Sequence, residues 1–192
     1  MARGGADLGA MFGAGRVETF LGLPAVDLAN LPAGLPAVIF GAGAGTSYPS
    51  VGAYCRGGPA AIRAAAATYA ANLAHQNFDL GGPCFPGAVA GDAGDLPVVD
   101  GAHAGNRALI RAAAERILGS GSVPVLIGGD DSVPIPLLQA FEGRKIRILQ
   151  IDAHVDWRDE VQGERWGLSS TMRRASEMAH VAGIVQVGQR GI

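Results

Sequence analysis

The sequence lacks the features that would place it in a membrane or on a nucleic acid. Among its 192 residues, no apolar run approaches the roughly 18 residues that a membrane-spanning helix needs. Its formal net charge of −2 provides no electrostatic attraction for nucleic acid or for an anionic membrane surface. We therefore expect no nucleic-acid partner and no membrane partner.

The sequence also has little that suits an oxidising compartment. It contains only two cysteines, Cys55 and Cys84, and they form no C-x-x-C pair, so a disulfide framework is not expected. The N-terminus lacks a basic segment followed by an apolar core, which argues against a secretory signal. These absences predict a reduced, cytoplasmic protein.

Nucleotide-binding loops are missing as well. Residues 41–46 read GAGAGT after an apolar run, which is typical of the start of a dinucleotide-binding motif. The third glycine of G-x-G-x-x-G would fall at Thr46, however, and Pro49 follows before a helix can begin. No Gly-Lys-Ser or Gly-Lys-Thr of a Walker loop is present. A nucleotide site is therefore not expected.

The composition that remains favours one α/β domain with a sizeable core. The chain is 48% hydrophobic and 17% charged, and it has 30 glycines. Residues 1–35 are rich in Gly, Ala and Pro, and we interpret them as an N-terminal arm. Residues 36–192 then form the α/β domain. Because the chain stops directly after a strand, we expect it to be the N-terminal portion of a larger fold, incomplete at its C-terminus.

Strand and helix patterns alternate along this domain. Short β-branched runs predict buried strands, and Pro, Gly and apolar periodicity mark the helices. The expected strands are 37–40, 96–99, 123–127, 146–151 and 183–188, and the expected helices are 60–74, 106–118, 133–141 and 170–178. This order predicts a mainly parallel sheet flanked by helices.

Two of the predicted strands end in acidic residues. The first runs into residues 128–132, which read GGDDS, and the second into residues 152–156, which read DAHVD. The helix between them makes a βαβ unit, so both acidic ends should emerge at the same edge of the sheet. Ligands of open α/β sheets bind outside the carboxyl ends of the strands. Carboxylates that converge there repel one another unless a cation is bound, so the pattern predicts a metal site.

The second acidic end has the spacing of a ligand set. Asp152, His154 and Asp156 are two residues apart, which would point their side chains to one side of an extended strand end. Two carboxylates and an imidazole suit a divalent ion such as manganese. Alternatively, Asp152 caps the following turn while His154 and Asp156 are solvated. The neighbouring acidic strand end favours the metal interpretation.

The first acidic end offers two adjacent carboxylates. One of Asp130 and Asp131 could bind a metal while the other anchors the loop. Alternatively, Asp131 or Ser132 caps the helix that begins near Val133. Both interpretations can hold if one of these residues binds the metal and another caps the helix.

Together, these two motifs resemble G-G-D-H-S and D-A-H-x-D of the ureohydrolases, the arginase and agmatinase family. Further agmatinase-like stretches are residues 19–24, 45–48, 58–63, 172–175 and 185–191. The resemblance implies an arginase-like three-layer α/β fold, of which this chain is the N-terminal portion. It also implies a binuclear manganese centre and a homo-oligomer, a trimer or a hexamer.

The resemblance also implies a reaction and roles for residues. A metal-bound hydroxide attacks the carbon of a small cationic guanidino substrate and releases urea and an amine. Carried over by position, Asp152 bridges both metals, His154 binds one of them, and Asp156 binds the other and holds the hydroxide. Asp131 stands where the motif has a metal-binding histidine. The implied metal ligands are therefore Asp131, Asp152, His154 and Asp156, with Asp156 also catalytic.

Three departures from the family pattern leave alternatives open. Asp131 in place of histidine makes the site harder and favours manganese or magnesium over zinc. Residues 168–170, which read LSS, stand where many relatives have His-Gly-Thr, and no later D-x-D-x-x-D segment follows. The leading expectation is an agmatinase-like hydrolase of a linear guanidino compound. The alternative is a catalytically impaired ureohydrolase-like subunit that serves as a structural partner in an oligomer. A deacetylase-like enzyme with one zinc is a third option, disfavoured by the acidic first motif.

Overall fold

The computed structural model describes residues 17–83, 87 and 90–191 of the chain. Cys84 and most of the first half of the predicted arm lie outside these residues. In chain order the helices and strands are the 3-10 helix η1 (Phe20–Gly22), β1 (Ala37–Ala42), α2 (Gly58–Ala66), the 3-10 helix η2 (Ala67–Asn72), β2 (Gly91–Asp95), α3 (His103–Gly119), β3 (Val123–Gly128), α4 (Pro134–Gln139), β4 (Ile146–Ile151), the 3-10 helix η3 (Leu168–Ser170), α5 (Thr171–Ser176) and β5 (Val181–Val187).

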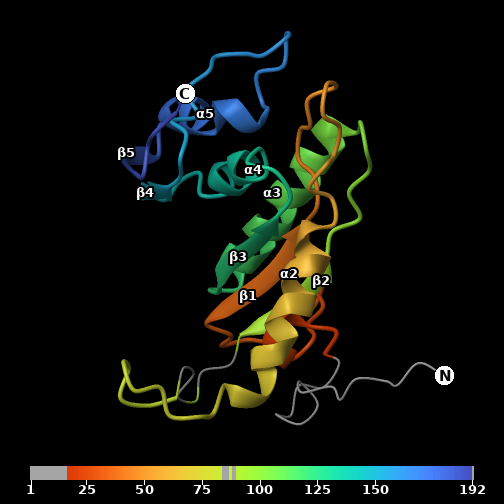
Figure 1. The fold of residues 1–192 in the computed structure, drawn as a ribbon, viewed down its shortest axis with the longest axis vertical. Helices are drawn as coiled ribbons and strands as arrows, with labels where there is room; N and C mark the ends of the chain where they lie inside the picture. The colour runs from red at the N-terminus through yellow and green to blue at the C-terminus, as the bar shows by residue number, and fades with distance from the viewer. Residues whose placement is uncertain (1–16, 84–86, 88–89, 192) are drawn as a thin grey trace, which may run out of the picture.

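The strands form two parallel sheets. The first sheet has the order β2-β1-β3, and the second consists of β4 and β5. Figure 1 shows α2 in front of the first sheet and α3 behind it, while α5 lies close to β4 and β5. The predicted α/β class with a mainly parallel sheet is thus confirmed. The two acid-tipped strands are not hydrogen-bonded neighbours, however, because β3 pairs with β1 and β4 pairs with β5.

The core lies around β1. Val38 and Phe40 are fully buried on one face of the sheet, where they pack in one cluster with Ile110 and Ile117 of α3. Burying such side chains stabilises the fold by about 1.5–3 kcal/mol each. The opposite face of β1 is covered too, since Ile39 belongs to a second buried cluster. Both faces of β1 are therefore removed from water.

The strand β2 corrects one prediction. The expected strand at residues 96–99 is wrong, and the chain is extended instead at Gly91–Asp95. The sequence GDAGD has low strand propensity, but tertiary contacts override it. Asp92 is buried, and its carboxylate accepts hydrogen bonds from Arg63 Nε and Nη2, both at 2.8 Å. Its backbone N–H donates to Pro24 O at 2.9 Å, so part of the predicted arm packs along β2.

The predicted helices are present with shifted ends. The helix expected over 60–74 is α-helical only to Ala66 and continues as the 3-10 helix η2. The helix expected from residue 106 begins at His103, and the helix expected from residue 133 begins at Pro134. The helix expected over residues 170–178 is divided into η3 and α5. Among the helices of the described residues, none combines the length and the apolar character that crossing a bilayer requires.

Candidate metal centre

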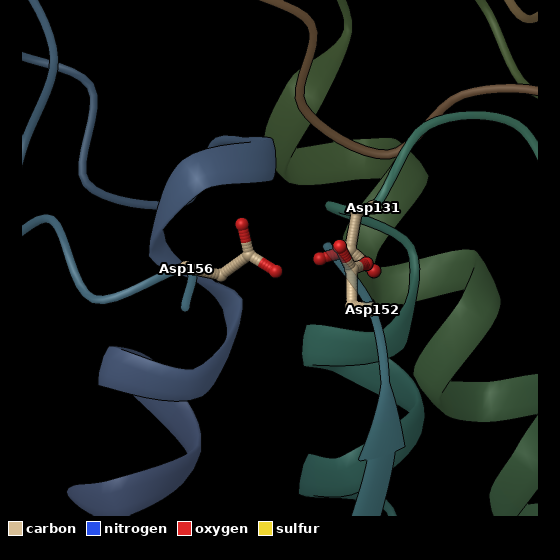
Figure 2. Close-up of side chains that lie close together, drawn as sticks. All are labelled: Asp131, Asp152 and Asp156. Carbon is tan, nitrogen blue, oxygen red and sulfur yellow. The ribbon is translucent and has the colours of Figure 1, made fainter. Parts of the chain in front are cut away.

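Three carboxylates meet where the two sheets approach each other. Asp131 follows β3, whereas Asp152 and Asp156 follow β4. One oxygen from each carboxylate lies within 4.8 Å of the other two. Figure 2 shows Asp156 on one side of this group, facing Asp131 and Asp152 on the other. The predicted meeting of both acidic strand ends is therefore observed, although the strands themselves do not pair.

The group is electrostatically unfavourable without a cation. Burial, followed by the charges of Asp156 and Asp152, raises the pKa of Asp131 to about 8. Its Oδ2 atom is buried and has no hydrogen-bond partner among the described residues. A buried carboxylate oxygen without a donor is destabilising. A hard divalent cation would remove both problems, so these three residues fit a metal of the manganese or magnesium type.

The structure separates the roles of the two adjacent acids at the end of β3. The Oδ1 atom of Asp130 accepts hydrogen bonds from the N–H of Ser132 at 3.0 Å and from its hydroxyl at 2.5 Å. The Ser132 hydroxyl oxygen in turn accepts the N–H of Thr46 at 2.7 Å. Asp130 therefore anchors the loop, and Asp131 belongs to the acidic group. The capping interpretation is wrong, because Val133 is the N-cap of α4 and no side chain caps it.

Close backbone packing explains the glycines that precede Asp130. A Cβ atom at Gly129 would lie only 2.1 Å from the carbonyl oxygen of Gly43. The Gly129 N–H donates to Ala42 O at 2.8 Å. The missing side chain at Gly129 therefore lets the loop after β3, which carries Asp131, approach the chain after β1 closely.

Asp156 is held by both its backbone and its side chain. Its φ of 48° lies in the left-handed region, which is uncommon for residues other than glycine. Its carbonyl oxygen accepts the N–H groups of Met172 and Arg173, both at 3.1 Å. Its Oδ2 atom accepts a hydrogen bond from Gln150 Nε2 at 2.7 Å. Sequence analysis did not single out Gln150, although a polar residue inside an apolar strand run was a signal for it.

His154 stands apart from the acidic group. Its side chain is 61% exposed, and its Nδ1 atom lies 3.5 Å from Asp152 Oδ1. The three-carboxylate group that could hold a metal does not include it. Asp152 and Asp156 thus converge while His154 between them does not, so the two-residue spacing does not place three side chains on one side. Asp152 caps the following turn, as the alternative interpretation of the sequence predicted, since its Oδ1 accepts the His154 N–H at 2.8 Å.

The segment after Asp156 is tied to the rest of the molecule. Asp159 accepts a hydrogen bond from the buried side chain of Arg174 at 2.5 Å. Arg107 lies 5.3 Å from the ring centre of Trp166, a cation–π contact. Arg174 is thus a buried partner of this segment, and Arg107 contacts the segment through Trp166. These contacts give the loop beside the acidic group a defined position.

Comparison with known proteins finds one family that matches most of the chain. The model of the arginase family matches residues 36–192. A mitochondrial agmatinase of Gallus gallus is 30% identical over 140 residues, which cover 71% of this chain and 40% of that protein. The structure of proclavaminate amidino hydrolase from Streptomyces clavuligerus is similar, with a TM-score of 0.75 and 25% identity, over 93% of this chain and 58% of that one.

A third likeness concerns the fold alone. The structure of a Trypanosoma cruzi formiminoglutamase with Mn2+ matches with a TM-score of 0.66 and 20% identity, over 91% of this chain and 58% of that one. The predicted arginase-like fold is thus confirmed. The chain spans 40% to 58% of the length of these proteins.

Proposed function

Because this chain belongs to the arginase family, we propose that the protein hydrolyses a small cationic guanidino compound to urea and an amine. Asp131, Asp152 and Asp156 would hold a divalent metal for this reaction. The observation that carries the proposal is the buried Asp131 Oδ2 atom, which faces two further carboxylates and has no hydrogen-bond donor among the described residues. The agmatinase relative supports the choice of a guanidino substrate.

Manganese is the metal that we propose. The ligand group of the described residues consists of carboxylates, which prefer hard divalent ions over zinc. Membership of the arginase family supports the same choice, and so does the manganese in the formiminoglutamase of similar fold. The implied pair of metals, with His154 as a ligand of one of them, is part of the proposal. So are the homo-oligomer and the cytoplasmic location.

The residues of this chain would have distinct tasks in the reaction. When bound, a divalent metal lowers the pKa of water from about 15.7 toward neutrality and so supplies hydroxide at working pH. Asp156 has one oxygen that accepts the hydrogen bond from Gln150, which leaves its second oxygen free of that bond. That oxygen can accept the proton that the attacking water gives up. The negative charge of the group also attracts a guanidinium ion.

The overall reaction consumes one water for each substrate molecule. The water oxygen bonds to the guanidino carbon, and the bond from that carbon to the alkyl nitrogen breaks. Both protons of the water end on the leaving nitrogen, which departs as an ammonium ion with the positive charge of the substrate, and urea is the second product. Asp156 would hold the first of these protons between bond formation and bond cleavage.

Metal content and urea release together test the proposal. Protein purified with manganese should hold one to two ions per chain and release urea from agmatine, guanidinobutyrate or guanidinopropionate. Asp152→Asn should abolish both properties, because it removes the carboxylate next to Asp131. Asp79→Asn is the matched control, since Asp79 is exposed and lies outside the acidic group. Unchanged metal content and urea release in Asp152→Asn would refute the assignment.

The alternative function is a structural subunit without activity of its own. The exposed position of His154 favours it, because a ligand carried over from the family then lies outside the acidic group. This alternative would be supported by metal-loaded protein that releases no urea from any of the three guanidino compounds but is an oligomer when measured by light scattering. Urea release above the level of Asp152→Asn would exclude it.

A further inference from the structure

Two glutamines form a hydrogen-bonded chain that ends on Asp156. Gln186 of β5 donates from Nε2 to Gln150 Oε1 at 2.6 Å, and Gln150 of β4 donates from its own Nε2 to Asp156 Oδ2 at 2.7 Å. The two glutamines are directly paired residues in the register of β4 and β5. The sheet therefore aligns their side chains, and the amide chain runs from β5 across β4 to the acidic group.

The chemistry of the groups fixes the direction of every bond. An ionised carboxylate can only accept, so Gln150 must turn its NH2 group toward Asp156. Its carbonyl oxygen then faces Gln186, which must also present an NH2 group. Gln186 Nε2 makes a second bond to the carbonyl oxygen of Val155 at 2.9 Å, so both of its donor hydrogens have acceptors. Rotating either amide by half a turn would place oxygen against oxygen.

Both bonds of Gln186 act on the neighbourhood of Asp156. One reaches the Asp156 side chain through Gln150, and the other holds the backbone of the preceding residue, Val155. Asp156 itself needs such support because its φ of 48° is unfavourable for a residue with a side chain. Gln150 and Asp156 are both buried, so water competes little for these bonds.

We propose that Gln150 and Gln186 are positioning residues for the metal centre. By occupying one oxygen of Asp156, the pair turns the other oxygen toward Asp131 and Asp152. This inference rests on the proposed function, because it assumes that the acidic group binds a metal. Hydrogen bonds that orient a metal ligand typically affect metal affinity by ~10–100-fold. Gln150 and Gln186 have no contact with the substrate in this role.

Manganese titration of the full chain tests the positioning role. Gln150→Met keeps the length of the side chain but removes the donor, and it should weaken manganese binding by ~10–100-fold. Gln186→Met should weaken it less, because Gln150 can still reach Asp156. Gln139→Met, at the end of α4, is the matched control and should bind as the wild type does. Manganese affinity in Gln150→Met equal to that of the control would overturn the proposal.

A second measurement needs no metal and separates this inference from the proposed function. In the metal-free protein, the side-chain amide NMR signals of Gln150 should shift in Gln186→Met, because the Gln150 carbonyl loses its donor. The same signals should stay in place in Gln139→Met. Unchanged Gln150 signals in Gln186→Met would refute the amide chain. If the wild type binds no manganese, the proposed metal centre and the positioning role both fail. The amide signals then decide by themselves whether the two bonded glutamine amides hold Asp156.

Discussion

The strands β1 and β3 of the first sheet resemble β4 and β5 of the second in their apolar composition, but the two sheets differ in how they are covered. In the first sheet, β1 has five consecutive buried residues, with helices on both faces (Figure 1). In the second, the described residues leave one face of β4 and β5 bare. It carries two cross-strand pairs of aliphatic side chains with exposed fractions of 51% to 79%, namely Leu149 with Val185 and Ile151 with Val187. Parallel sheets are ordinarily covered on both faces.

This difference shows that strand composition does not determine burial by itself. The other face of β4 and β5, which holds Ile148 and Gln150, is half-buried or buried, so only alternate residues are exposed. The acidic group lies between the two regions, with Asp131 from the covered sheet and its two partners from the half-covered one. A cation bound there would join the regions by direct bonds to both.

The largest effect is expected at the edge of the covered sheet. Asp92 has no exposed side-chain surface and pairs with Arg63, which is also buried. Arg63→Met would leave this carboxylate buried without its cation and should lower the free energy of unfolding by about 3–5 kcal/mol. Urea denaturation measures the loss. Arg111→Met is the matched control, because Arg111 pairs with Glu115 and Glu142 at the surface, where such pairs contribute about 0–1 kcal/mol.

The same pair predicts how acid should act. Burial opposes ionisation of Asp92, but hydrogen bonds from Arg63, Phe20 and Gly94 outweigh it and hold the pKa below its usual range. A carboxyl group with a lowered pKa in the folded state stabilises the protein above its unfolded pKa of about 3.9. That contribution is lost as the pH falls through the folded pKa. Equal stability of Arg63→Met and Arg111→Met at pH 7 would contradict this role for the pair.

An intermediate effect is expected at the junction of the sheets. In the metal-free folded protein the pKa of Asp131 is about 8, against an unfolded value of about 3.9. Between these values the folded state holds a proton that the unfolded state has lost, so stability should fall as the pH rises from about 4 to 8. Asp131→Asn removes this dependence. It should raise the melting temperature of the metal-free protein at pH 8 by roughly 2–4 °C for each kcal/mol of repulsion relieved.

With manganese bound, the wild type should instead melt at a higher temperature than Asp131→Asn. Binding stabilises the folded state in proportion to affinity, so the metal should raise the melting temperature of the wild type more than that of Asp131→Asn. Calorimetry at pH 5 and pH 8, with and without manganese, separates the two contributions. A wild type whose metal-free melting temperature rises between pH 5 and pH 8, with Asp131→Asn following the same curve, would be evidence against the raised pKa.

The sequence was sufficient to predict the elements with strong patterns. Most of the strands were predicted from apolar runs, and the meeting of the two acidic ends followed from their places after strands. Sheet order was not predictable in this way, because the predicted βαβ unit put β3 and β4 in one sheet, whereas β3 pairs with β1 and β4 pairs with β5 in a second sheet. The strand β2 was missed because its residues favour turns, and tertiary contacts such as the buried bond from Arg63 to Asp92 stabilise them there.

Within the site, residue types were predictable but their roles were not. Asp130 and Asp131 are neighbours of identical chemistry, and the backbone N–H and hydroxyl of Ser132, which both bond Asp130, distinguish them. The side-chain direction at Asp156 depends on a positive φ that no local pattern indicates. The ligand role of His154 stays a prediction, since its ring lies outside the acidic group.

The smallest effect is expected on the bare face, and a matched pair of substitutions compares the two sheets directly. Val185 is 60% exposed in β5, and Val38 is fully buried in β1. Changing valine to threonine keeps the shape and adds a hydroxyl, which water can solvate at Val185 but not at Val38. Val185→Thr should therefore change the free energy of unfolding by less than about 0.5 kcal/mol, and Val38→Thr should lower it by about 1–3 kcal/mol. Urea denaturation of both variants measures the difference. If Val185→Thr destabilised the protein as much as Val38→Thr does, the face of β4 and β5 would be covered in solution, and the comparison between the sheets would not hold.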